Sequence, residues 1–151
     1  MIDYNKKFIS YLRLVNKKLT IERQELLQAV LDFANQSEES GIKHFNAKDI
    51  FHEIKKIGSP LSLATVYRVL PIFCEAGIIV EVAKRGGKMI YELASEENHH
   101  DHLICIKCGR IIEFRNDELE LLQQQICKKL CFCMTDHQHC IKGICIDCKS
   151  S

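Results

Sequence analysis

Side chains that can bind metal ions are concentrated in one stretch of this sequence, residues 98–114. The stretch reads NHHDHLICIKCGRIIEF and holds three of the seven histidines, an aspartate, a glutamate and a Cys-x-x-Cys pair. Imidazole, carboxylate and thiolate groups are the usual protein ligands of transition metals. Metal binding is therefore the first chemistry that the sequence suggests.

Two Cys-x-x-Cys pairs, Cys105/Cys108 and Cys145/Cys148, could together enclose one tetrahedral Zn²⁺. A closed site of four thiolates is structural rather than catalytic, because it leaves no open coordination position. The alternative is a redox-active Cys-x-x-Cys pair. It is disfavoured, since a thioredoxin-like site needs one such pair at a helix start rather than two. We therefore predict a structural zinc that ties the chain end to the strand near Cys105.

The histidines point to further sites. If residues 99–106 are extended, successive side chains alternate between two faces, with His99 and Asp101 on one and His100 and His102 on the other. One strand could then supply two sites with nitrogen and oxygen ligands, which suit Fe²⁺, Mn²⁺, Zn²⁺ or Co²⁺. Candidate partners from elsewhere in the chain are Glu113, Glu120, His137 and His139.

The composition is that of an ordinary globular protein. The chain has 151 residues, 46% of them apolar and 27% charged, enough for one domain with a substantial core or for two small ones. No apolar run is long enough to span a membrane, and no secretion signal is visible. Nine cysteines in such a chain favour metal thiolates in a reducing cytosol over disulfides. We therefore expect a cytoplasmic protein with no membrane partner.

Charge is unevenly distributed along the chain. Residues 1–93 contain 14 Lys+Arg against 11 Asp+Glu, a net charge of +3, and residues 94–151 contain 7 against 9, a net charge of −2. This difference favours polyanion binding by the first part of the chain, but weakly.

The first part of the chain has a helical pattern. We predict helices over residues 3–15, 20–33, 46–57 and 62–76, with Thr20, Asn46 and Ser62 as N-caps and a polar loop over residues 35–41. The last two helices, joined by a short turn, have the outline of a helix-turn-helix. Pro71 lies inside the fourth predicted helix, where it should cost about 3 kcal/mol or kink the helix.

Residues 78–82 and 89–93 alternate in polarity and flank a basic, glycine-containing segment, residues 84–88. This pattern predicts a β-hairpin, and a hairpin after a helix-turn-helix makes a winged helix. Tyr67 and Arg68 on an exposed helix face could contact DNA, although side chains that merely cover a helical surface would look the same. Farther along, Asp117 and Glu120 resemble a capping box that begins a helix extending to Leu130, a role that competes with metal binding by Glu120.

Taken together, these motifs resemble the ferric uptake regulator (Fur) family of bacterial metal-responsive repressors. The resemblance runs from about Leu19 to Cys148 and rests on LATVYRVL at 63–70, AGI at 76–78, GGK at 86–88, HHDHLICxxCG at 99–109, IIEF at 111–114 and the final cysteine pair. It implies an α+β protein. Residues 1–93 would be an N-terminal winged helix-turn-helix DNA-binding domain, residues 94–98 a hinge, and residues 99–151 a small C-terminal α/β domain for metal binding and dimerisation.

The resemblance also assigns residues to sites. The regulatory metal would be held by His44, Glu92, His100, His102 and Glu113. A second metal site would consist of His99, Asp101, Glu120 and His137. The structural zinc would take Cys105, Cys108, Cys145 and Cys148. DNA would be contacted by Thr65, Tyr67 and Arg68 in the major groove and by Lys18 in the minor groove.

The function implied is that of a metal-dependent transcriptional repressor of metal uptake genes rather than an enzyme, with Fe²⁺ as the leading regulatory ion. It would bind AT-rich palindromic operators as a homodimer or tetramer, because two-fold protein symmetry matches two-fold operator symmetry. One alternative is the peroxide-sensing branch of the same family, which typically has aspartates in place of Glu92 and Glu113.

Two alternatives come from other classes. A small metallohydrolase would need an open coordination position and a general base, and would leave the helix-turn-helix unexplained. A thiol-based metal store would use the additional cysteines. Cys131 stands where the family usually has glycine, and Cys127, Cys133 and Cys140 are further thiols; we interpret them as small buried hydrophobic residues in preference to redox sensors.

Overall fold

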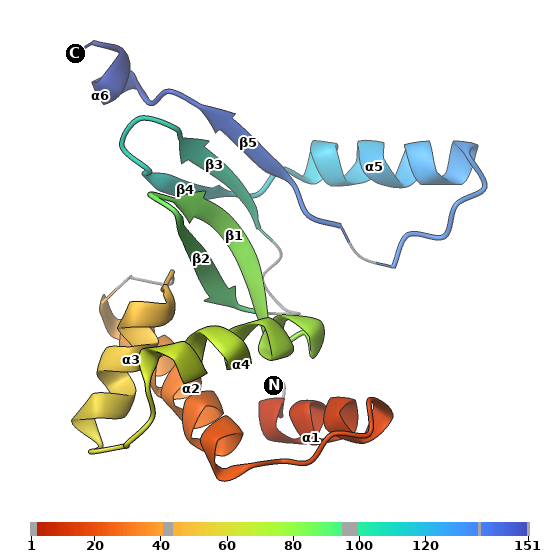
Figure 1. Cartoon of the computed structure of the whole chain (residues 1–151). Helices are drawn as coiled ribbons and strands as arrows, with labels where there is room; N and C mark the ends of the chain where they lie inside the picture. Colours follow the sequence, from red (N-terminus) through yellow and green to blue (C-terminus); the bar gives the residue numbers. More distant parts are fainter. Residues whose placement is uncertain (1–2, 41–43, 95–99, 136, 151) are drawn as a thin grey trace. The chain divides into compact units, whose positions relative to one another are not determined.

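The computed structural model describes residues 3–40, 44–94, 100–135 and 137–150, with side chains in the second helix described as far as residue 36. The chain divides into two compact units, residues 1–96 and 97–151. Within the described residues, four helices are followed by short strands and two further helices (Figure 1), which confirms the predicted α+β class. Of the predicted hinge, only Ala94 lies within the described residues.

Four helices form most of the first unit: α1 (Tyr4–Leu14), α2 (Ile21–Ser40), α3 (Ala47–Lys56) and α4 (Leu63–Glu75). The predicted caps are in place. Thr20 Oγ1 accepts from the Arg23 amide at 3.4 Å, and Ser62 Oγ accepts from the Thr65 amide at 3.2 Å. Asn46 forms a full capping box with Asp49. The caps satisfy amides that no helical carbonyl reaches, which is why these residue types begin the helices.

One loop prediction is wrong. The polar residues 35–40 continue α2 to Ser40 instead of forming a loop from residue 35. Polar residues do not in themselves end a helix, and no glycine or proline occurs in the chain between Ala34 and Ser40. The helix can therefore continue through this polar segment.

Pro71 does not end α4, which runs unbroken from Leu63 to Glu75. Proline inside a helix costs about 3 kcal/mol because one amide donor is lost. Burial of Leu70 and Phe73 on either side of it stabilises the same turns by about 1.5–3 kcal/mol each. The buried face of α4 therefore outweighs the local cost of the proline.

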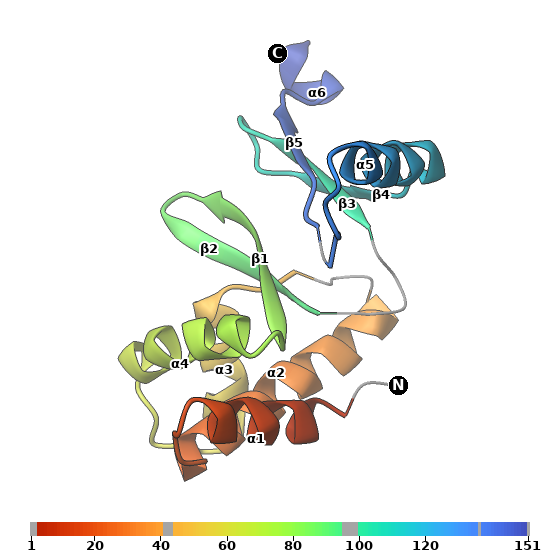
Figure 2. The same ribbon diagram turned by 90° about the vertical axis from the view of Figure 1, so that its right-hand side faces the viewer.

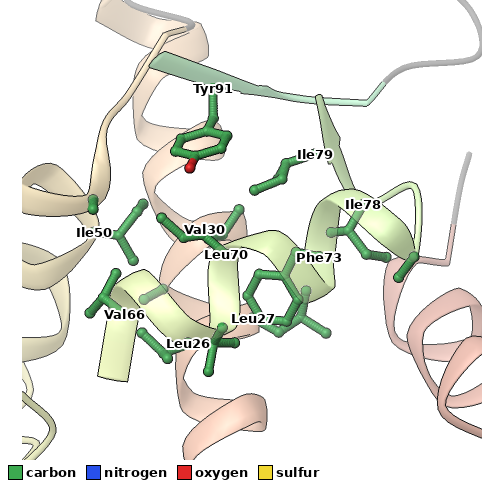
Figure 3. Close-up of a cluster of buried hydrophobic side chains, with 14 of the residues drawn as sticks. Leu26, Leu27, Val30, Ile50, Val66, Leu70, Phe73, Ile78, Ile79 and Tyr91 are labelled. Carbon is green, nitrogen blue, oxygen red and sulfur yellow. The ribbon is translucent and has the colours of Figure 1, made fainter. Parts of the chain in front are cut away.

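The core of the first unit includes buried residues from all four helices and from the strands that follow them, and part of it lies between α2 and α4. Leu70 and Phe73 of α4 point toward Leu26, Leu27 and Val30 of α2 (Figure 3), and all five are at most 2% exposed. This packing sets the orientation of α4, the second helix of the helix-turn-helix, relative to α2.

The wing of the winged helix is the antiparallel hairpin β1 (Ile79–Arg85) and β2 (Lys88–Leu93), which stands on one side of the four helices (Figures 1 and 2). Its strands extend farther than predicted. Arg85 pairs with Lys88, so the turn consists of Gly86 and Gly87 alone. Their φ angles of +54° and +78° fit the two-residue turn that glycine permits. The basic side chains thus lie on paired strand ends rather than in a loose loop.

The second unit is a three-stranded sheet with strand order β4-β3-β5, accompanied by two helices. Strand β3 (Asp101–Cys105) pairs antiparallel with β4 (Ile111–Phe114) and parallel with β5 (Cys140–Gly143). Helix α5 (Asp117–Lys129) lies in the long connection between β4 and β5, and α6 (Ile146–Lys149) follows β5. Parallel pairing requires such a crossover connection, and it brings the two cysteine pairs to the same end of the sheet.

The cap of α5 differs from the prediction. Asn116, not Asp117, is the N-cap, and its side-chain oxygen accepts from the amides of Glu118 and Leu119 at 2.9 and 3.0 Å. Asparagine is a strong N-cap residue, and it precedes the predicted one by a single position. Glu120 is therefore not needed for a capping box and is available for other contacts.

The additional cysteines are not all buried. Cys131 and Cys133 are exposed in this chain, while Cys127 and Cys140 are partly buried, so the interpretation as buried hydrophobic residues is wrong for the first two. Cys131 has a φ of +54°. It occupies the left-handed position after α5, where the Phe132 amide donates to the Cys127 carbonyl at 2.8 Å. This left-handed conformation is most favourable for glycine, which has no Cβ.

Across the residues that the structure describes, no helix combines the length and the apolar character needed to cross a membrane.

Candidate metal centres and nucleic-acid surface

The two cysteine pairs come together in the second unit. The four sulfur atoms all lie within 4.8 Å of one another, with 3.7 Å between Cys108 Sγ and Cys145 Sγ. Zinc–sulfur bonds of about 2.3 Å in a tetrahedron place the sulfur atoms about 3.8 Å apart. The donor set and its spacing therefore fit a four-thiolate Zn²⁺ site formed by Cys105, Cys108, Cys145 and Cys148.

The electrostatics of this cluster also fit a cation. Main-chain amides of Cys108 and Cys145 donate to Cys105 Sγ and lower the pKa of that thiol to about 5, which favours the thiolate. Hydrogen bonds with the sulfur atoms of Cys145 and Cys108 raise the pKa of Cys148 to about 12. Four thiolates so close together repel one another, and a divalent cation at their centre would remove that penalty.

Polar contacts join the two cysteine loops independently of the sulfur atoms. Lys107 Nζ, between the first two cysteines, donates to the Cys148 carbonyl at 2.8 Å. Arg110 Nη1 lies 2.6 Å from Asp147 Oδ2, between the last two cysteines. Both contacts are exposed, so each contributes modestly to stability. Their effect is to hold the loops in the register that the four thiols need.

Two of the five predicted regulatory ligands meet within the first unit. His44 Nε2 lies 3.3 Å from Glu92 Oε2, and Glu92 is only 8% exposed. An isolated antiparallel bridge produces this contact, because Phe45 and Tyr91 exchange main-chain hydrogen bonds of 2.9 and 2.7 Å. Residues next to such a bridge face each other across the pair. The loop histidine is thereby brought beside the β2 glutamate.

The other three predicted regulatory ligands meet within the second unit. The rings of His100 and His102 have centroids 4.9 Å apart, and His100 Nε2 lies 4.0 Å from Glu113 Oε2. Glu113 pairs with His102 in the β3–β4 ladder, so its position follows from strand register. His102 is 3% exposed. Two imidazoles and a carboxylate gathered in this way form a partial ligand set for a divalent ion.

The predicted second site lies at the junction of β3, α5 and the segment before β5. Ligand atoms of Asp101, Glu120 and His137 all lie within 4.8 Å of one another, and His137 Nε2 is 3.1 Å from Glu120 Oε1. Asp101 is 1% exposed, although ionised carboxylates are costly to bury without a cation or donor. These residues fit a divalent ion. His99, the fourth predicted member, lies outside the described residues.

His139 is a residue that the sequence interpretation considered but did not assign to a site. Its Nδ1 lies 3.7 Å from Asp101 Oδ2. Its spacing from His137 is a sequence feature that points to the same site, because residues two apart in an extended segment face the same side.

The predicted DNA-contacting residues are accessible on the first unit. Tyr67 and Arg68 of α4 are exposed, and Arg68 Nη2 is 3.4 Å from the hydroxyl of the partly buried Thr65. Lys18 is exposed before α2, and the Arg23 guanidinium donates to its carbonyl oxygen. On the wing, the exposed cations are Lys84, Arg85 and Lys88. Arginine, lysine and tyrosine side chains presented in this way suit contacts with phosphates and base edges.

Comparison with known proteins gives a consistent result. The family model described as "Ferric uptake regulator family" matches residues 15–142. The ferric uptake regulation protein of Legionella pneumophila is 39% identical over 132 residues, which covers 87% of this chain and 91% of the relative. That of Yersinia pestis is 37% identical over 150 residues, covering 96% and 93%.

Solved structures agree in fold. The ferric uptake regulator of Pseudomonas aeruginosa with manganese has a TM-score of 0.73 at 30% identity, covering 96% of this chain and 99% of that one. The Helicobacter pylori regulator, for which three functional metal-binding sites are described, has a TM-score of 0.68 at 29% identity, covering 98% and 93%. The Francisella tularensis regulator with iron has a TM-score of 0.65 at 36% identity, covering 87% and 94%.

Proposed function

This chain belongs to the ferric uptake regulator family of metal-responsive, DNA-binding transcription regulators, which act as dimers, and we propose that it is a metal-dependent repressor of metal uptake genes. The observation that carries the proposal is the pair of partial ligand sets. His44 with Glu92 belongs to the DNA-binding unit, and His100, His102 and Glu113 belong to the other unit. Membership of this family argues against the metallohydrolase interpretation.

In the proposed mechanism, one divalent ion completes both partial sets. Two ligands in the first unit are too few for a stable site, and the three in the second leave coordination positions open. An ion that binds all five residues stabilises the one arrangement of the two units in which they meet. Metal binding then shifts the population toward the DNA-competent form. The size of the shift is set by the difference in the ion's affinity for the two forms.

Fe²⁺ is the proposed regulatory ion, supported by the imidazole and carboxylate ligands and by the iron-containing Francisella relative. The same ligands accept Mn²⁺, the ion of the Pseudomonas structure. Zn²⁺ is proposed at the four thiols, where it would hold the end of the chain to the sheet. Asp101, Glu120 and His137 are proposed for the second site, so that this chain would carry three sites, the number described for the Helicobacter relative.

The proposed DNA target is an AT-rich palindromic operator. Helix α4 would enter the major groove with Thr65, Tyr67 and Arg68, and Lys18 would reach the minor groove, where lysine is attracted by the negative potential of narrow AT tracts. The wing cations would contact phosphates, which add affinity without reading sequence. A palindrome is expected because a two-fold dimer presents two copies of α4.

The second unit carries the apolar surface that a dimer needs. Leu103 pairs with Ile112 on one side and Ile141 on the other, forming a row across the sheet in which each residue is 36% to 46% exposed. No residue of α5 is buried in the chain, and Leu121, Leu122 and Ile126 are about half exposed. We propose that a second copy covers these residues, and that two dimers can form a tetramer. Leu103→Asp should yield monomers in sedimentation, whereas Lys142→Asp on β5 should not.

A peroxide-sensing role is the second candidate within the family, but the ligands favour metal sensing, since that branch typically has aspartates where this chain has Glu92 and Glu113. Aerobic exposure to Fe²⁺ followed by mass spectrometry separates the two. A gain of one oxygen on His44 or His100 would reverse the ranking. The cytoplasm is the proposed location, because operator DNA and reduced thiols are both found there.

A mobility-shift assay tests the repressor proposal directly. The zinc-loaded protein and an AT-rich palindrome are mixed without oxygen, with Fe²⁺, Mn²⁺ or Zn²⁺ added, or with a chelator that spares the four-thiol zinc. Binding should require the added ion and should be weaker on a scrambled duplex of equal length. A shift that is equally strong with chelator, or absent with all three ions, contradicts the proposal.

A further inference from the structure

We infer that His139 is an additional ligand of the second metal site, donating Nδ1 to a divalent ion that Asp101, Glu120 and His137 also hold. The inference rests on the second site proposed above and extends it by one residue. It would give that site four ligands from described residues of the second unit alone, two imidazoles and two carboxylates.

The carboxylate of Asp101 provides the first argument. The side chain is 1% exposed, and its Oδ1 has no hydrogen-bond partner among the described residues. Oδ2 faces His139 Nδ1, but the 3.7 Å between them is too long for a hydrogen bond. A carboxylate buried in this way is strongly destabilising unless a cation or a donor compensates it. The arrangement therefore calls for a positive charge next to Asp101.

The imidazole of His139 provides the second argument. Its Nδ1 is inaccessible to solvent and, like Asp101 Oδ1, makes no hydrogen bond within the described part of the chain. Buried polar atoms without a hydrogen bond are rare in proteins, and here two occur on neighbouring side chains. Metal–ligand bonds of about 2.1 Å at a tetrahedral angle hold two ligand atoms about 3.4 Å apart. If the distance between Asp101 Oδ2 and His139 Nδ1 shortens by a few tenths of an ångström, one ion can bind both atoms.

The backbone holds His139 in place. Its carbonyl accepts from the His102 amide at 3.2 Å, immediately before β5 begins pairing with β3. His137 lies two residues earlier, so in an extended segment both imidazoles face the same side. His137 Nε2 is already 3.1 Å from Glu120 Oε1. Asp101 is therefore the residue that both parts share, because its carboxylate lies near Glu120 and His137 and also 3.7 Å from His139 Nδ1.

The second imidazole changes the metals that the site accepts. Carboxylate-rich sites suit Mn²⁺, whereas imidazole nitrogen favours Zn²⁺, Co²⁺ and Fe²⁺. With His139 the described ligands are two nitrogens and two oxygens instead of one nitrogen and two oxygens, so the site should discriminate more strongly in favour of Zn²⁺ over Mn²⁺. Replacing His139 by leucine removes the ligand nitrogen and puts an apolar side chain of similar length in its place.

The test uses the full-length protein with the four-thiol zinc retained. Zn²⁺ and Mn²⁺ affinities are measured by competition with a chelator, and Co²⁺ binding by visible absorption, for the wild type, His139→Leu, Glu120→Gln and the control His52→Leu. His52 is exposed on α3 in the other unit. His139→Leu should weaken Zn²⁺ at one added site by at least about tenfold, weaken Mn²⁺ less, and change the Co²⁺ spectrum. His52→Leu should change none of these.

The outcomes separate this inference from the proposal on which it depends. If Glu120→Gln removes the ion while His139→Leu behaves like His52→Leu, the second site stands and the role of His139 is overturned. If neither variant loses an ion, both the second site and the role of His139 are overturned. Loss of metal-dependent DNA binding is not a readout here, so failure of the repressor proposal would be seen separately.

Discussion

His44 Nε2 lies 3.3 Å from Glu92 Oε2, and the main-chain bridge between Phe45 and Tyr91 holds the pair together. The contact joins the loop before α3 to the second strand of the wing. Two potential metal ligands are therefore tied by backbone hydrogen bonds to elements of the unit that carries the proposed DNA-binding surface.

Glu92→Gln should abolish metal-dependent DNA binding while leaving the fold intact. The amide keeps the shape of the side chain but removes the negative charge that a divalent ion needs. Coupling between two ligands typically amounts to a factor of about 5–150 in affinity. We expect the operator affinity with and without the regulatory ion to become equal in titrations followed by fluorescence anisotropy. Glu118→Gln, on the exposed first turn of α5, should retain the full metal effect; an equal loss in both variants would contradict the assignment.

Cys105→Ser should cost the protein its structural zinc and unfold the second unit. Apparent binding free energies of structural zinc are about 10–16 kcal/mol, as large as the whole stability of a small domain. Zinc per chain by elemental analysis, and thermal unfolding by circular dichroism, measure the two effects. Cys133→Ser makes the same chemical change at an exposed cysteine of the same unit and should alter neither. Retention of one zinc per chain in Cys105→Ser would count against a four-thiolate site.

Lys84→Ala on the wing and Arg68→Ala on α4 should weaken DNA binding in different ways. Loss of a phosphate contact at Lys84 should lower affinity for all duplexes alike and reduce the slope of log affinity against log salt by about 0.9. Loss of a base contact at Arg68 should cost about 1–3 kcal/mol on the operator and less on a scrambled duplex. Lys142→Ala, an exposed cation of the other unit, is the control. The assignment fails if all three variants share one salt slope and one specificity ratio.

Cys131→Gly should stabilise the second unit. The left-handed φ of +54° costs a residue with a Cβ about 1 kcal/mol, and glycine adopts it freely. Denaturant unfolding at fixed protein concentration should show a higher midpoint. The same substitution at Cys133, whose φ is negative, should lower stability by about 0.5–1 kcal/mol through added freedom of the unfolded chain. A lower midpoint for Cys131→Gly would indicate that its thiol makes a stabilising contact in the dimer.

Cys74 should be the least reactive thiol at pH 8 among the cysteines outside the four-thiol site. Burial, with smaller contributions from Glu81 and Glu75, raises the pKa of this thiol from 9.0 to about 11. The thiolate fraction, and with it the rate of alkylation, should then be about 100-fold below that of an ordinary thiol. Because the folded pKa is the higher one, the unfolded chain loses the proton first, and stability should fall as the pH rises above about 9. Mass spectrometry after timed alkylation, with the exposed Cys133 as reference, measures the difference.

The local features of this protein follow from the sequence. Caps at Thr20, Asn46 and Ser62, the glycine turn of the wing and the two cysteine loops depend on residues within one turn of chain, so residue type and spacing predict them. The assignment of His100 and His102 to the same ligand group follows from strand alternation, and the structure places their rings side by side. Membership of the family was likewise predicted from the LATVYRVL and HHDHLICxxCG motifs.

Where two local sequence signals compete, only the structure shows which one prevails. Asn116 and Asp117 are both good caps, and only the observed hydrogen bonds show that Asn116 begins α5. The polar residues after Ala34 fit a loop or a helical extension equally well. Pro71 looked disruptive because its cost is local, whereas the burial of α4 that offsets this cost comes from packing against other elements of the first unit.

Contacts between distant segments were decided by tertiary structure alone. Glu92 meets His44 because a cross-strand bridge sets their register, and His139 approaches Asp101 because β5 pairs in parallel with β3. Such registers depend on core packing and on hydrogen bonds between segments that no local pattern relates. The sequence by itself therefore determined which side chains are available for metal and DNA, and the fold decided which of them meet.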